Sequence, residues 1–386
     1  ADPIPGRSGR GRDSRVLPGM MDPVALFFGT RPQVIKASVL RDALAATGPV
    51  VAIDTGQHYD YSMQQVHYDQ LGVRAPDAFL GIGSGSHAEQ TAAILTASET
   101  WLKDHPARIA VVIGDTNTTM ACALAAAKRR IPIAHVEAGL RAADRLMAEE
   151  INRRVTDAVA HWLFAPCARV ADVLRQAHPE AVVQNVGDVA HDVLLKAVPQ
   201  APPPESVAGY DPAWHGRFVY ATLHRAELVD SPGRLRAVVE SLNRSPLPVL
   251  LAAHPRTAGA LERLVIPLGP MVRRIAPVGY LESLALTQAA AVIVTDSGGL
   301  QREAYWLGRP CVTVRGETEW AETVELGANC LVPPEDADEL ASAISAAASR
   351  DGGGSWDRGA YGDGGAARRI AAVLGTTSQG PSKASR

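Results

Sequence analysis

The sequence predicts an α/β fold built from two doubly wound domains that face each other across a cleft. The chain has 386 residues, which is more than a single hydrophobic core usually supports. Short apolar runs alternate with helical patterns along most of it, as is typical of parallel sheets covered on both faces. A Pro/Ala-rich stretch at 197–206 breaks this alternation and predicts a linker between the two halves.

The first half contains three strand-like runs, at 24–28, 109–113 and 131–136. The first run ends at a glycine, and Pro32 then suits the first turn of a helix whose apolar residues recur at helical spacing. An Ala-rich helix is predicted at 119–130, between the other two runs. This order of elements predicts a parallel sheet with crossover helices.

Four apolar runs in the second half, at 217–222, 248–253, 291–295 and 311–314, predict the strands of a second sheet. The two ends of the chain are rich in Gly, Arg, Ser and Lys and show no periodicity. We expect a disordered leader or expression remnant at 1–20, a first domain at 21–196, a second domain at 197–362 and a disordered tail at 376–386.

Composition excludes several classes of protein. A net charge of −3 argues against a nucleic-acid partner, and no apolar run reaches the length of a membrane span. No signal peptide is recognisable, so we expect a cytoplasmic protein with no membrane partner. The four cysteines have no metal-ligand spacing and sit among apolar residues, which predicts buried, reduced thiols and no metal site: Cys122, Cys167, Cys311 and Cys330.

Ligands of doubly wound folds bind beyond the carboxyl ends of the strands, so polar residues that follow strands are the candidate site residues. Arg31 and Lys36 follow the first run, after a glycine turn that leads into a helix, and suit anionic oxygens. An ordinary turn with two solvated basic side chains explains this segment equally well.

Acidic residues follow strands or begin helices at three places. Asp115 follows the run at 109–113, where it could simply cap the next helix. Glu137 closes an apolar strand, an expensive place for an unpaired charge. Glu149 and Glu150 open a helix, where carboxylates usually complement the dipole. Three acidic positions that converge on one cleft also resemble a general acid/base set.

The second half offers basic residues at the ends of strands. His224 and Arg225 follow the run at 217–222 and could bind a phosphate or steady a leaving group, although a lone histidine there is more often structural. His254 also follows a strand and could line a nucleotide pocket.

The strongest local pattern is a strand that ends in Ser297, Gly298 and Gly299 and leads into a helix. Such a turn forms a nest of backbone N–H groups that suits a diphosphate. Glu303 lies about one turn into that helix, where its carboxylate could accept from ribose hydroxyls. The alternative is a glycine-rich turn with Glu303 in solvent.

Together these segments resemble the non-hydrolysing UDP-N-acetylglucosamine 2-epimerases, enzymes of the GT-B fold, which has two Rossmann-like domains. The resemblance spans 24–374 and rests on ten motifs in order: GTRPQVIK, TGQHYDY, GSGSHAEQT, GDTNTT, HVEAGLR, EEINRR, HRAE, HPRT, TDSGGLQREA and ETEW. It implies cofactor-free and metal-free chemistry on a UDP-sugar, with UDP lost and re-added through a 2-acetamidoglucal. It also implies a homodimer and a final helix at 363–375 that packs back on the first domain.

The resemblance assigns roles to individual residues. The catalytic set that it implies is Asp115, Glu137, Glu149 and His224. The substrate-binding residues that it implies are Arg31, Lys36, Ser297, Gly298, Gly299 and Glu303, and the full predicted substrate-binding set also includes Arg141, Arg225 and His254. Gln57 and His58 match positions linked in some members to a second, activating substrate molecule.

The sequence departs from the family pattern at six positions: Gln33, Ala148, Asp188, Leu228, Arg302 and Ala321. A neutral Gln33 and a cationic Arg302, each in place of a glutamate, are expected to change the local charge. The alternatives to an epimerase are a GT-B glycosyltransferase, a sugar-nucleotide hydrolase and a catalytically silent sugar-nucleotide binding protein. The three carboxylates favour epimerisation, because a transferase needs no base at C2.

Overall fold

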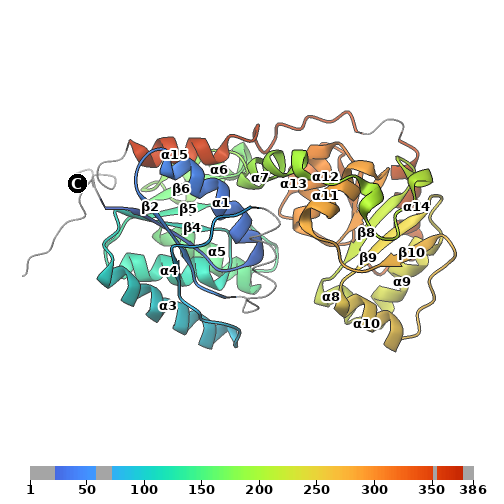
Figure 1. Ribbon diagram of the computed structural model, residues 1–386, viewed down its shortest axis with the longest axis horizontal. Helices are drawn as coiled ribbons and strands as arrows, with labels where there is room; N and C mark the ends of the chain where they lie inside the picture. The colour runs from blue at the N-terminus through green and yellow to red at the C-terminus, as the bar shows by residue number, and fades with distance from the viewer. Residues whose placement is uncertain (1–21, 58–71, 351–353, 377–386) are drawn as a thin grey trace, which may run out of the picture.

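The computed structural model describes residues 22–57, 72–350 and 354–376, and these form two parallel sheets with helices on both faces (Figure 1). The predicted fold class is confirmed. Each sheet has its own buried core. The central strands are almost entirely buried, as parallel strands covered on both faces must be: every residue of Val24–Phe28 is buried, and so is every residue of Val219–Leu223 except the half-buried Thr222.

The first sheet has seven strands in the order β3-β2-β1-β4-β5-β6-β7. Its strands are β1 (Val24–Phe28), β2 (Val50–Asp54), β3 (Ala78–Phe79), β4 (Ile109–Ile113), β5 (Ile133–Val136), β6 (Trp162–Ala165) and β7 (Val182–Asn185). Its helices are α1 (Arg31–Ala45), α3 (His87–Asp104), α4 (Asn117–Lys128), α5 (Ala148–Val159), α6 (Ala168–Ala177) and α7 (Val189–Ala197).

The second sheet has six strands in the order β10-β9-β8-β11-β12-β13. Its strands are β8 (Val219–Leu223), β9 (Val249–Ala253), β10 (Val272–Ile275), β11 (Val292–Thr295), β12 (Cys311–Thr313) and β13 (Asn329–Leu331). The helices of this half are α8 (Ala226–Val229), α9 (Pro232–Asn243), α10 (Pro255–Arg263), α11 (Tyr280–Ala289), α12 (Gly298–Leu307), α13 (Ala321–Glu325) and α14 (Ala337–Ala348).

The strand order reverses once in each sheet, between β1 and β4 in the first and between β8 and β11 in the second. At such a switch point the connections leave in opposite directions and open a crevice at the carboxyl ends of the strands. The segments that follow these four strands hold most of the polar residues that the sequence singled out.

The helix predicted at 119–130 begins two residues earlier, at Asn117. Thr116 caps it, since its hydroxyl accepts the backbone N–H of Thr119. The expectation of four buried thiols is wrong for Cys330, which is exposed on β13, an edge strand of the second sheet. Burial raises the pKa of the Cys122 and Cys311 thiols to about 12.

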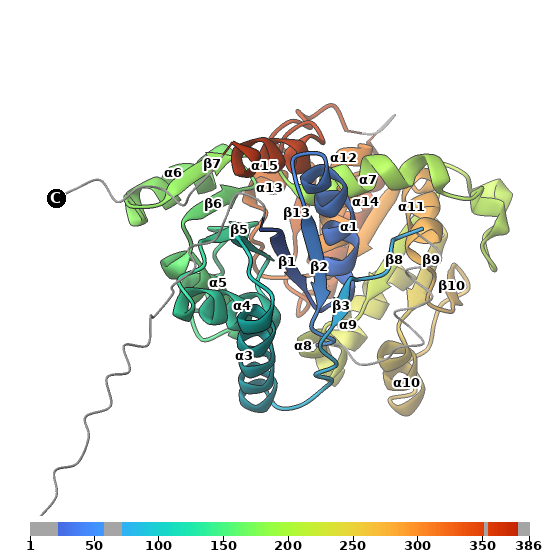
Figure 2. The same ribbon diagram turned by 60° about the vertical axis from the view of Figure 1, so that its left-hand side comes forward.

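The chain passes from one sheet to the other through three short 3₁₀ helices: η1 (Val198–Gln200), η2 (Pro204–Ser206) and η3 (Pro212–Trp214). Each has proline in its first turn, where the missing N–H is not needed. The last helix, α15 (Ala366–Gly375), packs on α1 and α7 of the first sheet (Figures 1 and 2). The exact domain boundaries stay a prediction.

Candidate active site

A cavity of about 660 Å³ lies between the carboxyl ends of the two sheets. Most of the candidate residues line it. The first half contributes Arg31, Lys36, Asp115 and Glu137, and the second half contributes His224, Arg225, His254, Ser297, Gly298, Gly299 and Glu303. Residues that are far apart in the sequence, such as Arg31 and Glu303, therefore share one site.

Glu137, directly after β5, is held through both carboxylate oxygens. Oε2 lies 2.5 Å from Nζ of Lys36, and Oε1 lies 3.2 Å from Nη1 of Arg302. Burial alone would raise the pKa of Glu137, but the two cations outweigh it and hold the pKa at about 2. The backbone φ of Glu137 is +64°, a left-handed conformation that a non-glycine residue adopts only where its surroundings impose it.

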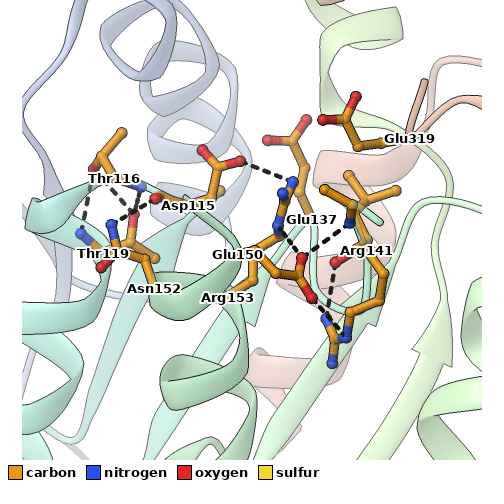
Figure 3. A network of polar contacts seen from close by, with 12 residues as sticks. Asp115, Thr116, Thr119, Glu137, Arg141, Glu150, Asn152, Arg153 and Glu319 are labelled. Atoms are coloured by element: carbon orange, nitrogen blue, oxygen red, sulfur yellow. Dashed lines mark hydrogen bonds and ion pairs between the residues drawn. The ribbon is translucent and has the colours of Figure 1, made fainter. Parts of the chain in front are cut away.

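Asp115 follows β4 and is paired with a buried arginine. Its Oδ2 lies 3.1 Å from Nη1 of Arg153 (Figure 3). Nε of the same arginine lies 3.3 Å from Oε2 of Glu150. Desolvation raises the pKa of Asp115, against the lowering effect of Arg153. Asp115 and Glu137 are thus two neighbouring carboxyl groups whose pKa values move in opposite directions, an arrangement typical of acid/base pairs.

His224, after β8, is oriented by a carboxylate that the sequence analysis did not single out. Nδ1 of His224 lies 2.8 Å from Oδ1 of Asp296, and Oδ2 of Asp296 accepts the backbone N–H groups of His224 and Arg225 at 2.8 Å each. Asp296 is fully buried, whereas the His224 side chain is 46% exposed in the cavity. The signal that could have found Asp296 is its place between β11 and the Ser-Gly-Gly turn.

The Ser-Gly-Gly turn forms the N-terminus of α12. The hydroxyl of Ser297 accepts the N–H of Leu300, and the first N–H groups of a helix have no acceptor within it. Neither Gly298 nor Gly299 has a positive φ, and a Cβ on either would meet only ordinary contacts, at 3.7 Å or more. The fold therefore does not require glycine there, whereas close approach of an anion to the backbone would.

Glu303 lies one turn further along α12 and lines the same cavity. Burial raises the pKa of Glu303 to about 7, although Arg302 and a hydrogen bond with Tyr280 lower it. A carboxyl group with such a pKa changes charge in the neutral range.

Three candidate residues in the described ranges lie outside the cavity lining. Glu149 is exposed in the first turn of α5, although its charge still acts on Asp115. Arg141 instead binds Asp157, with its Nη2 2.7 Å from Oδ2. Gln57 is buried and accepts the N–H and hydroxyl of Thr118 at the start of α4. His58 lies outside the described residues.

Glu150, the neighbour of Glu149, has a structural role. Its carboxylate is fully buried and accepts the N–H of Ala142 at 3.0 Å. It also binds Nε of Arg154 at 2.7 Å. Nε of Arg153 lies 3.3 Å from the same carboxylate (Figure 3). This network fixes the start of α5 and the arginine that pairs with Asp115.

Gln33, one of the departures from the family pattern, lies away from the cavity. Gln33 is 3% exposed and does not line the cavity. Its Oε1 accepts the N–H of Gly29 at 3.0 Å, and its Nε2 donates to the carbonyl oxygen of Ile113 at 2.7 Å. A glutamate could accept the first bond but could not donate the second, so the amide suits this position. Arg302, by contrast, does line the cavity.

In the part of the chain that the structure describes, no group of three or more His, Cys, Asp or Glu side chains could hold a metal ion. None of the helices in these ranges is both long and apolar enough to cross a membrane.

Sequence comparison places these residues in context. A family model described as UDP-N-acetylglucosamine 2-epimerase matches residues 43–375. The UDP-2,3-diacetamido-2,3-dideoxy-D-glucuronate 2-epimerase of Pseudomonas aeruginosa is 45% identical over 318 residues, which cover 80% of this chain and 88% of that protein. The UDP-N-acetylglucosamine 2-epimerase of Methanocaldococcus jannaschii is 40% identical over 321 residues, with the same coverage of 80% and 88%.

Solved structures resemble this one along nearly their whole length. The Methanocaldococcus jannaschii UDP-GlcNAc 2-epimerase in complex with UDP-GlcNAc and UDP superposes with a TM-score of 0.80 at 36% identity, covering 91% of this chain and 99% of that one. The Neisseria meningitidis UDP-GlcNAc 2-epimerase bound to UDP-GlcNAc gives a TM-score of 0.80 at 25% identity, again covering 91% and 99%.

Proposed function

The chain belongs to the UDP-N-acetylglucosamine 2-epimerase family, and from this we propose that it inverts C2 of a UDP-linked 2-acetamido sugar. The observation that carries the proposal is that Asp115, Glu137 and the turn at Ser297 line the same cavity. The first two supply acid/base groups with opposed pKa shifts, and the turn supplies a site for a diphosphate leaving group.

The reaction that we propose is an elimination followed by a re-addition. A carboxylate takes the C2 proton while the C1–O bond breaks, a C1=C2 double bond forms and UDP departs with the electron pair. Return of a proton to the opposite face of C2 and re-addition of UDP at C1 give the epimer. A proton must be removed from one face of C2 and returned to the other, and we assign Asp115 and Glu137 to these two faces. Glu149 is a third carboxylate near Asp115.

The remaining cavity residues are assigned to UDP. Gly298 and Gly299 offer N–H groups to the diphosphate, and Glu303 accepts from the ribose hydroxyls. His224, steadied by Asp296, faces the departing diphosphate. The basic residues that would stabilise its charge are Arg31, Lys36, Arg225 and His254.

Two substrates are compatible with the relatives. One relative is named for UDP-N-acetylglucosamine and the other for UDP-2,3-diacetamido-2,3-dideoxy-D-glucuronate. Both compounds have UDP at C1 and an acetamido group at C2, so the proposed chemistry is common to them. UDP-N-acetylglucosamine, with UDP-N-acetylmannosamine as product, is the substrate that we propose first. A homodimer stays a prediction.

Incubation with each sugar nucleotide, followed by chromatography and NMR of the products, tests the proposal. An epimerase converts one or both compounds to the manno epimer. It reaches the same equilibrium mixture whether the reaction starts from the substrate or from its C2 epimer. Release of free sugar would instead identify a hydrolase, and sugar found on an added acceptor would identify a transferase. Binding of UDP without any conversion of either compound would support a silent binding protein.

A further inference from the structure

Arg302, on α12 of the second half, contacts two carboxylates of the first half. Its side chain is only 9% exposed, and its Nη1 lies 3.2 Å from Oε1 of Glu137 and 2.5 Å from Oδ2 of Asp188. Glu137 follows β5, and Asp188 is the N-cap residue of α7. The guanidinium therefore joins the two halves of the cleft at a proposed catalytic group.

The same guanidinium is anchored within its own half. Nε of Arg302 donates to the carbonyl oxygen of Gly298 at 3.2 Å, and Cζ lies 3.9 Å from the centroid of the Trp320 ring. Gly298 is the first residue of α12, in the turn that we assign to the diphosphate. Arg302 is thus bonded both to that turn and to the carboxylate across the cleft.

Glu137 has little freedom in this arrangement. Lys36, on α1, holds one oxygen and Arg302 holds the other. The left-handed backbone of Glu137, with φ at +64°, is strained and persists only where neighbouring contacts impose it. The two cations thus set the direction of the carboxylate.

We propose that Arg302 is a positioning residue that fixes the Glu137 carboxylate for proton transfer at C2 and links it to the diphosphate-binding turn. The inference rests on the proposed function, because Arg302 acts on the reaction only through Glu137. The charged groups that face Glu137 are Lys36 on α1, Arg302 on α12 and Asp115 after β4, and Asp188 reaches it through Arg302.

The alternative is that Arg302 has a purely structural role and only stabilises the contact between the two halves. Loss of the cation alone would leave the charge of the fully buried Asp188 without its partner, and breaking a buried pair in this way is strongly destabilising. Arg302→Gln therefore cannot separate the two accounts. The double variant Asp188→Asn/Arg302→Gln can, because it removes both charges and leaves two amides in their place.

The test compares the full-length wild type, Arg302→Gln, the double variant and Arg302→Lys. Thermal melting reports stability, and titration of UDP reports the diphosphate site. Carboxyl 13C NMR, with the Glu137 signal assigned from Glu137→Gln, reports the ionisation of that residue without any turnover. Rates with the sugar nucleotide give kcat and KM.

In the double variant we expect near wild-type melting and UDP affinity, a pKa of Glu137 raised from about 2 toward its ordinary 4.5, and a kcat lowered about 10²-fold at little changed KM. Arg302→Lys keeps the positive charge. Its Glu137 pKa and its kcat should therefore lie much closer to the wild-type values than those of the double variant do. A double variant with wild-type Glu137 titration and wild-type kcat would overturn the inference. If the wild type converts no sugar nucleotide, the proposed function fails, and the NMR titration still decides whether Arg302 controls Glu137.

Discussion

Nδ1 of His224 lies 2.8 Å from Oδ1 of Asp296, and the other oxygen of that carboxylate accepts the backbone N–H of the same histidine. The carboxylate therefore holds both the ring and the main chain of His224. With Nδ1 occupied, Nε2 is the ring nitrogen that can meet a ligand in the cavity that His224 lines. Hydrogen bonds from His224 lower the pKa of Asp296, although burial alone would raise it.

Asp296→Asn should lower kcat about 10²-fold, because the amide no longer fixes the direction of the His224 ring. Steady-state kinetics with the sugar nucleotide measure the effect. If Asp296 acts through the histidine, the Asp296→Asn/His224→Asn double variant should be no slower than His224→Asn alone. Additive losses would show that the two residues act independently.

Glu149→Gln should lower turnover with little change in stability, whereas Glu150→Gln should mainly lower stability. Glu149 is exposed, so its substitution should change the free energy of unfolding by no more than about 0.5 kcal/mol while lowering turnover about 10²-fold. Glu150 holds a buried network, so its loss should cost several kcal/mol, of the order of 3–5. Urea unfolding and turnover assays on both variants separate the roles. A fully active Glu149→Gln would remove it from the catalytic set.

Gly299→Ala should weaken UDP binding about tenfold while raising stability by ~0.5–1 kcal/mol. A Cβ there meets only Oγ of Ser297 at 3.7 Å, so the fold accepts it, whereas a diphosphate at the helix N-terminus would not. Calorimetric titration with UDP and thermal melting give the two quantities.

Gly259→Ala is the matched control. Gly259 lies within α10, outside the cavity lining, with no atom within 4 Å of an added Cβ. It should stabilise the helix without changing UDP affinity. Equal UDP affinity in both variants would argue against a diphosphate at the Ser-Gly-Gly turn.

UDP affinity should fall as the pH is lowered through about 7, because Glu303 then gains a proton and loses its charge as an acceptor. Stability of the unliganded protein should change in the opposite sense. The pKa of Glu303 in the folded state lies above its ordinary 4.5, so the stability that protonation contributes is complete below 4.5 and is lost as the pH rises through about 7.

Glu303→Gln isolates this group. The phosphate of UDP also titrates, but it does so equally in both proteins, so the difference between them belongs to Glu303. Calorimetry with UDP and urea unfolding on either side of the folded-state pKa measure the two effects. Identical pH dependence in the variant and the wild type would contradict the assignment of Glu303 to the ribose.

Features set by short stretches of sequence could be predicted. The turn at Ser297, Gly298 and Gly299 is local, because a buried strand, two glycines and a helical pattern follow one another directly. The same holds for Glu137, which directly follows β5, and for Asp115, which follows β4 after a single glycine.

Contacts between distant residues could not be predicted. Arg302 and Asp188 are 114 positions apart and meet only because the two halves close on one another. The neutral Gln33 predicted a change of local charge, but nothing in the sequence shows that its side chain turns inward to the carbonyl oxygen of Ile113. Of the adjacent Glu149 and Glu150, a sequence gives no means to tell which one α5 buries.

Exchange of the sugar C2 proton tests the central claim most directly. The protein is incubated with UDP-N-acetylglucosamine, and in parallel with UDP-2,3-diacetamido-2,3-dideoxy-D-glucuronate, in D2O, and C2 is followed by NMR. We predict deuterium at C2 together with the manno epimer, and a loss of about 10²–10⁴-fold in Asp115→Asn and Glu137→Gln with UDP affinity retained. No deuterium at C2 of either bound sugar nucleotide, or full exchange in both variants, would contradict the account.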